Sequence, residues 1–220
     1  MKSNFDTIYA AIPDNVTLVA VSKTKPIELL KEAYELGERN FGENRVQEII
    51  QKHEVLPKDI QWHFIGHLQR NKVKYIAQFV HLIHSVDSIK LLKEINKCGK
   101  KHHRKISCLL QFHIAKEENK HGFSENEVIG HFEEISPKEY QHINFCGVMG
   151  MATFTKNTQL IDVEFKKLRE IFQCLKETNF KNKNEFKEIS MGMSQDYPLA
   201  IKQGSTMIRI GSSLFGSRNV

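Results

Sequence analysis

Residues 17–26 read T-L-V-A-V-S-K-T-K-P, and this stretch decides the fold that we predict. Its apolar run, 18–21, is bounded by turn residues, which is typical of a strand that is buried on both faces in a parallel sheet. Pro26 suits the first turn of a following helix, because its missing N–H would have no partner there. The pattern therefore predicts that Lys23 lies at the carboxyl end of a first inner strand.

Lys23 shares one face of an extended strand with Val19 and Val21. If that face lines a barrel interior, the ammonium lies among apolar neighbours, where desolvation lowers a lysine pKa and exposes a nucleophilic amine. A lysine that forms a Schiff base needs such an amine. The alternative interpretation is that Lys23 and Lys25 are solvated loop lysines, since lysines are mostly exposed.

The rest of the chain alternates short apolar runs with amphipathic segments. We expect an opening helix at 4–11 and then eight strands, at 18–21, 40–42, 62–66, 81–86, 106–114, 145–149, 188–191 and 207–211. The helices expected between them lie at 26–36, 45–53, 72–79, 125–134, 162–176 and 196–202. One more helix, which Asp87 or Ser88 can cap, is expected to run through Leu91, Leu92 and Ile95. Gly37 is expected to end the first of these helices.

Eight strand–helix units in 220 residues predict the α/β class and one (βα)8 barrel domain that spans residues 1–220. An open doubly wound sheet is the alternative architecture. The regular alternation and the lack of a G-x-G-x-x-G motif after the first strand favour the closed barrel.

The charge pattern excludes several partners. The chain has 32 Lys+Arg and 26 Asp+Glu, a net charge of +6, and the two signs are interspersed. We interpret the K-H-H-R-K run at 101–105 as a solvated loop, so no nucleic-acid partner is expected. No apolar run approaches the ~18 residues of a membrane span, and the N-terminus lacks the apolar core of a signal peptide. We therefore expect a soluble cytoplasmic protein without a membrane partner.

The cysteines and histidines do not indicate a metal site. Cys98, Cys108, Cys146 and Cys174 lack C-x-x-C spacing, and we expect buried free thiols in a reducing compartment. No H-E-x-x-H motif occurs, and His81 and His84 would face opposite ways on a strand.

Two glycine- and serine-containing loops indicate a phosphate site. In a (βα)8 barrel, function lies at the carboxyl ends of the strands, and the loops after strands seven and eight often hold phosphate. M-G-M-S at 191–194 follows the seventh strand and G-S-S at 211–213 the eighth. Small residues let backbone N–H groups approach an anion, and Ser194 and Ser212 could add hydroxyl donors. Glycine and serine end many strands, so the evidence lies in the pairing of the two loops.

Arg209 is predicted to point into the barrel. It shares a strand face with Met207 and Gly211, whereas Ile208 and Ile210 face the other way. A buried guanidinium needs a partner, because burying an unpaired charge is very costly. Either a carboxylate neutralises it or it donates to a ligand, and the residues alone leave both open.

Seven segments of the chain carry a family resemblance. They read A-V-S-K-T-K-P (20–26), F-G-E-N (41–44), W-H-F-I-G-H-L-Q (62–69), K-H-G-F (120–123), G-V-M-G-M-A (147–152), S-M-G-M-S-Q-D (190–196) and G-S-T-M-I-R-I-G-S-S-L-F-G (204–216). Over nearly its whole length, and in the same order, the chain resembles the pyridoxal 5'-phosphate (PLP) homeostasis proteins. That family is often called YggS or PROSC.

The resemblance implies a barrel like the N-terminal domain of alanine racemase, a fold-type III PLP enzyme. Lys23 would carry PLP as an internal aldimine, and Arg209 would face the pyridine nitrogen. Ser194 and the amides of the last loop would hold the phosphate. The cofactor-binding residues so implied are Lys23, Asn44, Met193, Ser194, Arg209, Gly211 and Ser212. His113 stands where many members have asparagine, and the N-terminal segment is short, so neither receives a role.

The resemblance leaves a choice between a carrier and an enzyme. In alanine racemase the second catalytic base comes from a separate C-terminal domain; this chain ends at Val220, so we expect no such domain. Arginine cannot act as an acid at neutral pH, so Arg209 would leave the pyridine nitrogen unprotonated and the ring a weaker electron sink. We expect a monomeric, non-catalytic protein that binds PLP and hands it to PLP-dependent apoenzymes. The alternatives are a single-domain PLP-dependent amino-acid racemase or lyase, and a barrel enzyme that acts on a phosphorylated metabolite without PLP.

Overall fold

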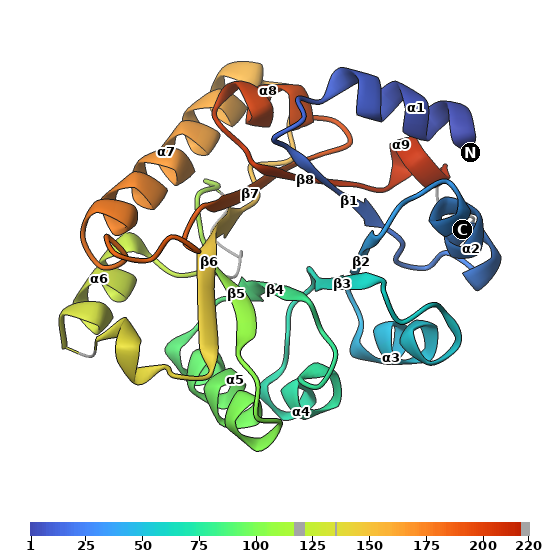
Figure 1. Cartoon of the computed structure of the whole chain (residues 1–220). Coiled ribbons are helices and arrows are strands. Elements are labelled where there is room, and N and C mark those ends of the chain that lie inside the picture. Colours follow the sequence, from blue (N-terminus) through green and yellow to red (C-terminus); the bar gives the residue numbers. More distant parts are fainter. Residues whose placement is uncertain (117–121, 135, 217–220) are drawn as a thin grey trace.

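The computed structural model describes residues 1–116, 122–134 and 136–216, which form a closed barrel of parallel strands (Figure 1). The strands are β1 (Thr17–Val21), β2 (Asn40–Glu43), β3 (Gln61–Phe64), β4 (Leu82–Val86), β5 (Ile106–Phe112), β6 (Ile143–Gly150), β7 (Glu188–Met193) and β8 (Met207–Ile210). Each strand pairs with the next in sequence, and β8 closes the barrel on β1. The predicted (βα)8 class is confirmed, and each predicted strand overlaps an observed one.

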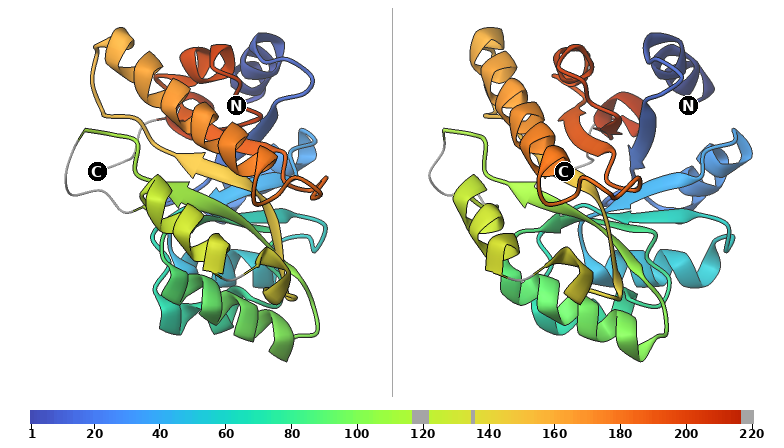
Figure 2. Two further views of the ribbon diagram at one scale, coloured as in Figure 1. Left: turned by 90° about the vertical axis from the view of Figure 1, so that its left-hand side faces the viewer. Right: turned by 60° about the vertical axis from the view of Figure 1, so that its left-hand side comes forward.

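Helices surround the barrel. They are α1 (Lys2–Ala11), α2 (Ile27–Glu35), α3 (Val46–Val55), α4 (Val73–Ile76), α5 (Ile89–Lys101), α6 (Glu125–Glu134), α7 (Thr158–Glu177), α8 (Tyr197–Lys202) and α9 (Ser212–Phe215), with 3-10 turns at Arg70–Lys72 and Pro137–Glu139. The side views show α1 and α7 on one side of the barrel and α5 on the opposite side (Figure 2). The Asn4 side-chain amide donates to the Leu214 carbonyl at 3.0 Å, which ties α1 to α9.

The predicted helix ends are confirmed at two places and wrong at a third. Gly37 follows the last turn of α2 with a φ of 99°, a conformation that glycine adopts without strain. Ser88 begins α5, and its hydroxyl accepts the Leu91 N–H at 3.4 Å. The helix predicted at 72–79 ends at Ile76. The chain turns there because the Arg104 guanidinium binds the carbonyl groups that follow α4.

Those contacts also correct the interpretation of the K-H-H-R-K run. Arg104 is half-buried, and it donates to the carbonyl of Gln78 at 2.7 Å and to that of Val80 at 2.9 Å. Lys101 belongs to the last turn of α5. The run is therefore the end of a helix and an anchor for a neighbouring turn, and only part of it is a solvated loop.

The cysteine prediction is confirmed in one respect and wrong in another. All four thiols are free. Cys98 and Cys108 are buried as predicted, whereas Cys146 and Cys174 are only half-buried. His81 is exposed and His84 is buried, as the strand alternation predicts.

The core has two layers. A large apolar layer lies between the strands and the helices and includes Ile208 and Ile210. A smaller cluster fills part of the barrel interior, with members Val19, Leu82, Leu109, Met149 and Met207. The remainder of the interior is polar and includes the buried side chains of His63, His84, Ser190 and Arg209. Arg209 therefore points into the barrel, as predicted.

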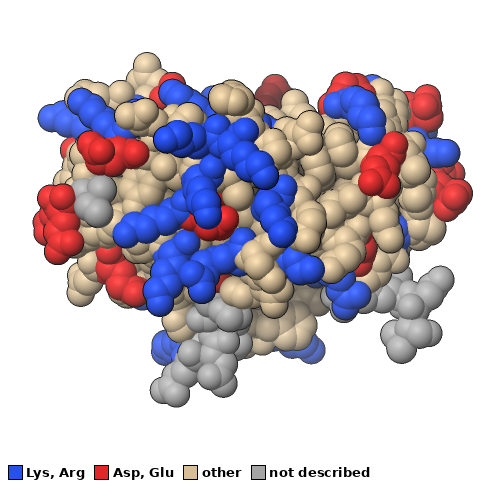
Figure 3. All heavy atoms as spheres, turned by 90° about the horizontal axis from the view of Figure 1, so that it is seen from below, with Lys and Arg blue, Asp and Glu red and all other residues tan. Residues whose placement is uncertain are grey.

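One face of the molecule carries many positively charged side chains. Lys and Arg side chains gather on the face seen from below, where α4 and α5 lie (Figure 3). The exposed lysines of α5 are Lys90, Lys93, Lys97, Lys100 and Lys101. Within the described ranges, none of the helices has both the length and the apolar character that crossing a membrane requires.

Candidate functional site

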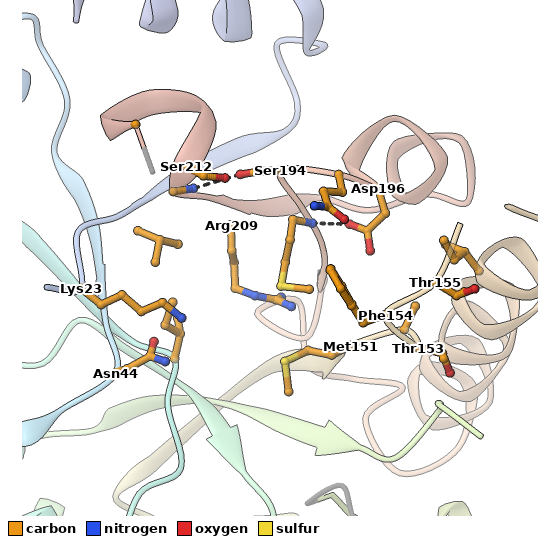
Figure 4. Close-up of a pocket in the computed structure, with 18 of the residues that line it drawn as sticks. Lys23, Asn44, Met151, Thr153, Phe154, Thr155, Ser194, Asp196, Arg209 and Ser212 are labelled. Carbon is orange, nitrogen blue, oxygen red and sulfur yellow. Dashed lines mark hydrogen bonds between the residues drawn. The ribbon is translucent and has the colours of Figure 1, made fainter. Parts of the chain in front are cut away.

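A cavity of about 350 Å³ lies at the carboxyl ends of the strands (Figure 4). Residues at or just after the carboxyl ends of β1, β2, β3, β6, β7 and β8 line it. The seven residues implied as cofactor-binding all lie on its wall: Lys23, Asn44, Met193, Ser194, Arg209, Gly211 and Ser212. The structure thus brings together residues that are as far apart in the sequence as Lys23 and Ser212.

Lys23 follows β1 and points into the cavity (Figure 4). Its neighbour Ser22 is fully buried and donates through its hydroxyl to Glu43 Oε1 at 2.6 Å. Lys52 Nζ donates to the Ser22 carbonyl at 2.9 Å and to Glu43 Oε1 at 2.7 Å. The chain immediately before Lys23 is therefore fixed by a buried ion pair.

The residue after Lys23 is held in an unusual backbone conformation. Thr24 has a φ of 63°, which for a β-branched residue costs of the order of 1–3 kcal/mol. Its backbone N–H donates to Glu48 Oε2 at 2.8 Å, and the Glu48 carboxylate also lies 3.5 Å from Lys52 Nζ. Lys23 is thus fixed on both sides by contacts to α3 and β2.

The buried Glu43–Lys52 pair affects the pKa of its acid. Burial raises the pKa of Glu43 to about 7, while the Lys52 ammonium and the Ser22 hydroxyl oppose that rise. Both side chains are nearly inaccessible, at 0% and 7% relative exposure. Glu43 is therefore a carboxyl with a raised pKa, and its hydrogen bond from Ser22 connects it to the residue before Lys23.

Lys25 has a different environment from Lys23. Its ammonium donates to the carbonyl oxygens of Phe215 and Gly216, each at 3.1 Å, and so binds the end of α9. Lys23 and Lys25 are both half-buried and both line the cavity. The interpretation of these residues as solvated loop lysines is therefore wrong, because the barrel rim and α9 enclose them.

The two predicted anion loops meet. The Gly211 N–H donates to Ser194 Oγ at 3.4 Å, and Ser194 and Ser212 lie side by side (Figure 4). The loops after β7 and β8 thus present two hydroxyl groups from one wall of the cavity. Such a wall can donate several hydrogen bonds to an anion.

Arg209 is held by neutral acceptors. Only 5% of the residue is exposed, and its guanidinium donates to Ser190 Oγ at 2.6 Å and to the Gly150 carbonyl at 3.1 Å. Within the described part of the chain, no carboxylate lies within salt-bridge distance of it. Burial lowers the pKa of Arg209 to about 10, and Asp196 opposes that shift from farther away. Arg209 thus remains a cation at the cavity wall.

Sequence reasoning did not assign a role to Asp196 or to the loop after β6. Asp196 Oδ1 accepts the Met193 N–H at 2.6 Å, and burial raises the pKa of this carboxyl. Glu164 on α7 accepts the backbone N–H of Thr153 at 2.7 Å, which holds the loop at the cavity. Phe154 is 78% exposed on the same wall. The S-M-G-M-S-Q-D motif contained Asp196, but nothing in the sequence pairs Glu164 with that loop.

Two other features of the sequence contribute less to the site. His113 follows β5, where its backbone N–H donates to the Phe123 carbonyl at 3.0 Å, and it is not among the cavity-lining residues. Lys120 and His121 of the K-H-G-F segment lie outside the described residues. In residues 1–116, 122–134 and 136–216, no group of three or more potential metal ligands occurs.

The site's chemistry fits PLP. Asn44 Oδ1 is buried in the cavity wall and, among the described residues, has no hydrogen-bond partner, so it offers an acceptor to a ligand. Lys23 provides an amine, Arg209 a fixed donor, and the paired serine loops an anion-binding wall. A small, planar, anionic aldehyde with a ring nitrogen complements these groups.

Comparisons with known proteins agree with this chemistry. The family described as "Alanine racemase, N-terminal domain" matches residues 1–219. The Pyridoxal phosphate homeostasis protein of Schizosaccharomyces pombe is 40% identical over 209 residues, which cover 93% of this chain and 85% of that protein. PipY of Synechococcus elongatus PCC7942, solved with PLP bound, is 32% identical, with a TM-score of 0.88 over 98% of this chain and 99% of PipY. An alanine racemase of Clostridium difficile shares the fold at 15% identity, with a TM-score of 0.78 over 100% of this chain and 57% of the racemase.

Proposed function

Because this chain belongs to the family of pyridoxal phosphate homeostasis proteins, we propose that it binds PLP and buffers or delivers that cofactor. The observation that carries the proposal is a cavity in which Lys23 and the two serine loops meet Asn44, whose side-chain oxygen has no hydrogen-bond partner among the described residues. The PLP-bound structure of PipY supports the same ligand. Free thiols are typical of a reducing compartment, which supports a cytoplasmic location.

Each residue of the site has a role in this proposal. The Lys23 amine forms a carbon–nitrogen bond to the aldehyde carbon, with loss of water. Ser194, Ser212 and the Gly211 N–H bind the phosphate. Arg209 donates to the ring nitrogen, and Asn44 and Met193 contact the bound ring. When bound, the cofactor supplies an electrophilic carbon and an aromatic electron sink.

A carrier role is favoured over catalysis. A racemase needs a base on each face of the carbanion; apart from Lys23 and Lys25, the described residues that line the cavity offer one carboxylate, Asp196, and no tyrosine or histidine. Arg209 does not release a proton at neutral pH, so it does not strengthen the ring as an electron sink. We propose that the protein is a monomer whose recipients are PLP-dependent apoenzymes. Light scattering and transfer of cofactor to an apoenzyme test these two points.

The decisive experiment asks where PLP attaches. Wild-type protein, Lys23→Ala and Lys25→Ala are mixed with PLP, and absorption spectra are recorded before and after borohydride reduction. Mass spectrometry then locates the reduced adduct. We expect a visible band and an adduct on Lys23 in the wild type and in Lys25→Ala, and neither in Lys23→Ala. A reducible adduct in Lys23→Ala would move the attachment to another lysine, and no band in the wild type would favour a PLP-independent enzyme.

One observation favours a second function, that of an amino-acid racemase or lyase. The Asp196 carboxyl lines the cavity, is only 8% exposed, and has a pKa raised by burial, which suits a proton-transfer group. Deuterium exchange at the α-carbon of amino acids tests this function. Rapid exchange that Asp196→Asn abolishes would establish an enzyme, whereas background exchange supports the carrier.

A further inference from the structure

A chain of buried hydrogen bonds runs through the barrel interior behind the site. Arg209 donates to Ser190 Oγ at 2.6 Å, and Ser190 Oγ lies 3.0 Å from His84 Nδ1. His84 Nε2 lies 2.9 Å from His63 Nδ1, and His63 Nε2 lies 3.2 Å from Asn40 Oδ1. The chain links β8, β7, β4, β3 and β2 and ends at the amino end of the barrel. We call it the histidine relay.

The direction of the histidine relay follows from its two ends. A guanidinium only donates, so Ser190 Oγ accepts from Arg209 and its own proton is available to His84 Nδ1. His84 then carries its proton on Nε2 and donates to His63 Nδ1. His63 in turn carries its proton on Nε2 and donates to Asn40 Oδ1, which can only accept. In the opposite direction, the Ser190 hydroxyl proton would have no acceptor in the relay. His63 Nε2 and Asn40 Oδ1 would then face each other as two acceptors with no proton between them.

This order requires both imidazole rings to be neutral. A second proton on His84 would occupy Nδ1 and displace the Ser190 hydroxyl proton. The surroundings agree with this. Burial and then His81 lower the pKa of His63 to about 3. Burial, followed by His63, the Arg209 cation and His81, lowers the pKa of His84. His63 and His84 are 1% and 0% exposed. In every bond of the relay the donor therefore lies on the Arg209 side, and the lone pair of each acceptor faces toward Arg209.

We propose that His84 and His63 are positioning residues that, through Ser190, fix Arg209 as a cationic donor at the cavity wall. The aligned dipoles of a hydroxyl and two neutral rings stabilise the guanidinium charge, although no carboxylate among the described residues pairs with it. The Gly150 carbonyl holds the second guanidinium nitrogen, so the two contacts together fix the plane of the group. The role toward the cofactor rests on the proposed PLP function, whereas the order of the relay does not.

The first experiment needs no PLP. Protein labelled with ¹⁵N-histidine is studied by long-range proton–nitrogen NMR, and His63→Gln and His84→Gln assign the two ring systems. We expect both rings to be neutral, with the proton on Nε2, from pH 8 to pH 5. Ser190→Ala should shift the His84 Nδ1 resonance, because that atom loses its hydrogen-bond donor. A proton on Nδ1 of either ring, or protonation of either ring within this range, would overturn the relay.

The second experiment measures PLP. Ser190→Ala removes the link to Arg209, and we expect PLP to dissociate about tenfold more readily, the effect of about one buried hydrogen bond to a charged group. In Ser190→Ala, Arg209 is no longer fixed, so we also expect the visible band of the bound cofactor to change with pH between 6 and 9. The wild-type band should not change over this range. Ser190→Thr keeps the hydroxyl and should restore both properties.

Ser85→Ala is the matched control. Ser85 lies beside His84 on β4, is 1% exposed, and its hydroxyl has no hydrogen-bond partner among the described residues. This variant should keep the wild-type affinity and spectrum. A Ser190→Ala protein that keeps both as well would refute the positioning role. Borohydride trapping at Lys23 separates the two proposals: no adduct in the wild type defeats PLP binding, while the NMR result still decides the relay.

Discussion

Replacing His63 by glutamine should remove a large part of the acid sensitivity of the fold. His63 is 1% exposed, and burial together with neighbouring His81 lowers its pKa from 6.5 to about 3. The unfolded chain therefore binds a proton at this ring more tightly than the folded chain does. The stability that the neutral ring provides is complete above pH 6.5 and is lost progressively as the pH falls from 6.5 toward 3.

The magnitude follows from the width of that window. Between pH 6.5 and pH 5 the loss is about 1.36 kcal/mol per pH unit, or about 2 kcal/mol for His63. The pKa of His84 is also lowered, by burial and then by His63 and Arg209, so it adds a loss of the same sign. Buried Glu43, whose pKa is raised to about 7, works in the opposite direction because the folded state takes up its proton first. The difference in unfolding free energy between the wild type and His63→Gln separates the contribution of His63 from the contributions of these other groups.

The assay is urea unfolding of the wild type and His63→Gln at pH 8, 7, 6 and 5. Glutamine does not titrate, so the stability gap between the two proteins should change by about 2 kcal/mol in favour of His63→Gln as the pH falls to 5. His103→Gln, at an exposed position, is the control and should run parallel to the wild type. Parallel curves for His63→Gln and the wild type would refute the burial argument.

Three further substitutions test other parts of the structure. Ser194→Ala should weaken PLP binding by about 1 to 3 kcal/mol if its hydroxyl meets the phosphate, and an unchanged dissociation constant would remove it from the site. Lys52→Met at pH 8 leaves Glu43 buried without its cation and should cost about 3 kcal/mol in urea unfolding, part of which Glu43→Gln should restore. Gly147→Ala, at a φ of 149°, would place a Cβ 1.8 Å from the Glu188 carbonyl oxygen of β7. It should lower the free energy of unfolding, measured by thermal unfolding, by about 3 kcal/mol or more. A decrease below about 1 kcal/mol would show that β6 can shift.

The barrel could be predicted because its determinants are local. Apolar runs, a proline and glycines mark strands and helix ends within windows of a few residues. The parallel topology then places every strand's carboxyl end at one rim, so Lys23, Ser194 and Ser212 were predicted to converge without any knowledge of contacts. The family resemblance added Asn44 and Met193, which no local pattern indicates.

Other features depend on contacts that no local pattern encodes. The early end of α4 follows from Arg104, which is 26 positions beyond the Gln78 carbonyl that it binds. The bond between His84 and Ser190 joins residues 106 positions apart. Strand alternation places both side chains inside the barrel, but the pairing depends on barrel register and tilt. Strand alternation therefore predicts that Arg209 points into the barrel, but it does not predict which residues Arg209 binds.

The backbone at Thr24 links the folding free energy to the function of the neighbouring lysine. A threonine in the left-handed region stores energy, and the Glu48 carboxylate is what keeps it there. Relaxation of this turn would release that energy and, in the same motion, reorient Lys23. A glycine at position 24 would relieve that strain and would allow the Lys23 amine a wider range of directions.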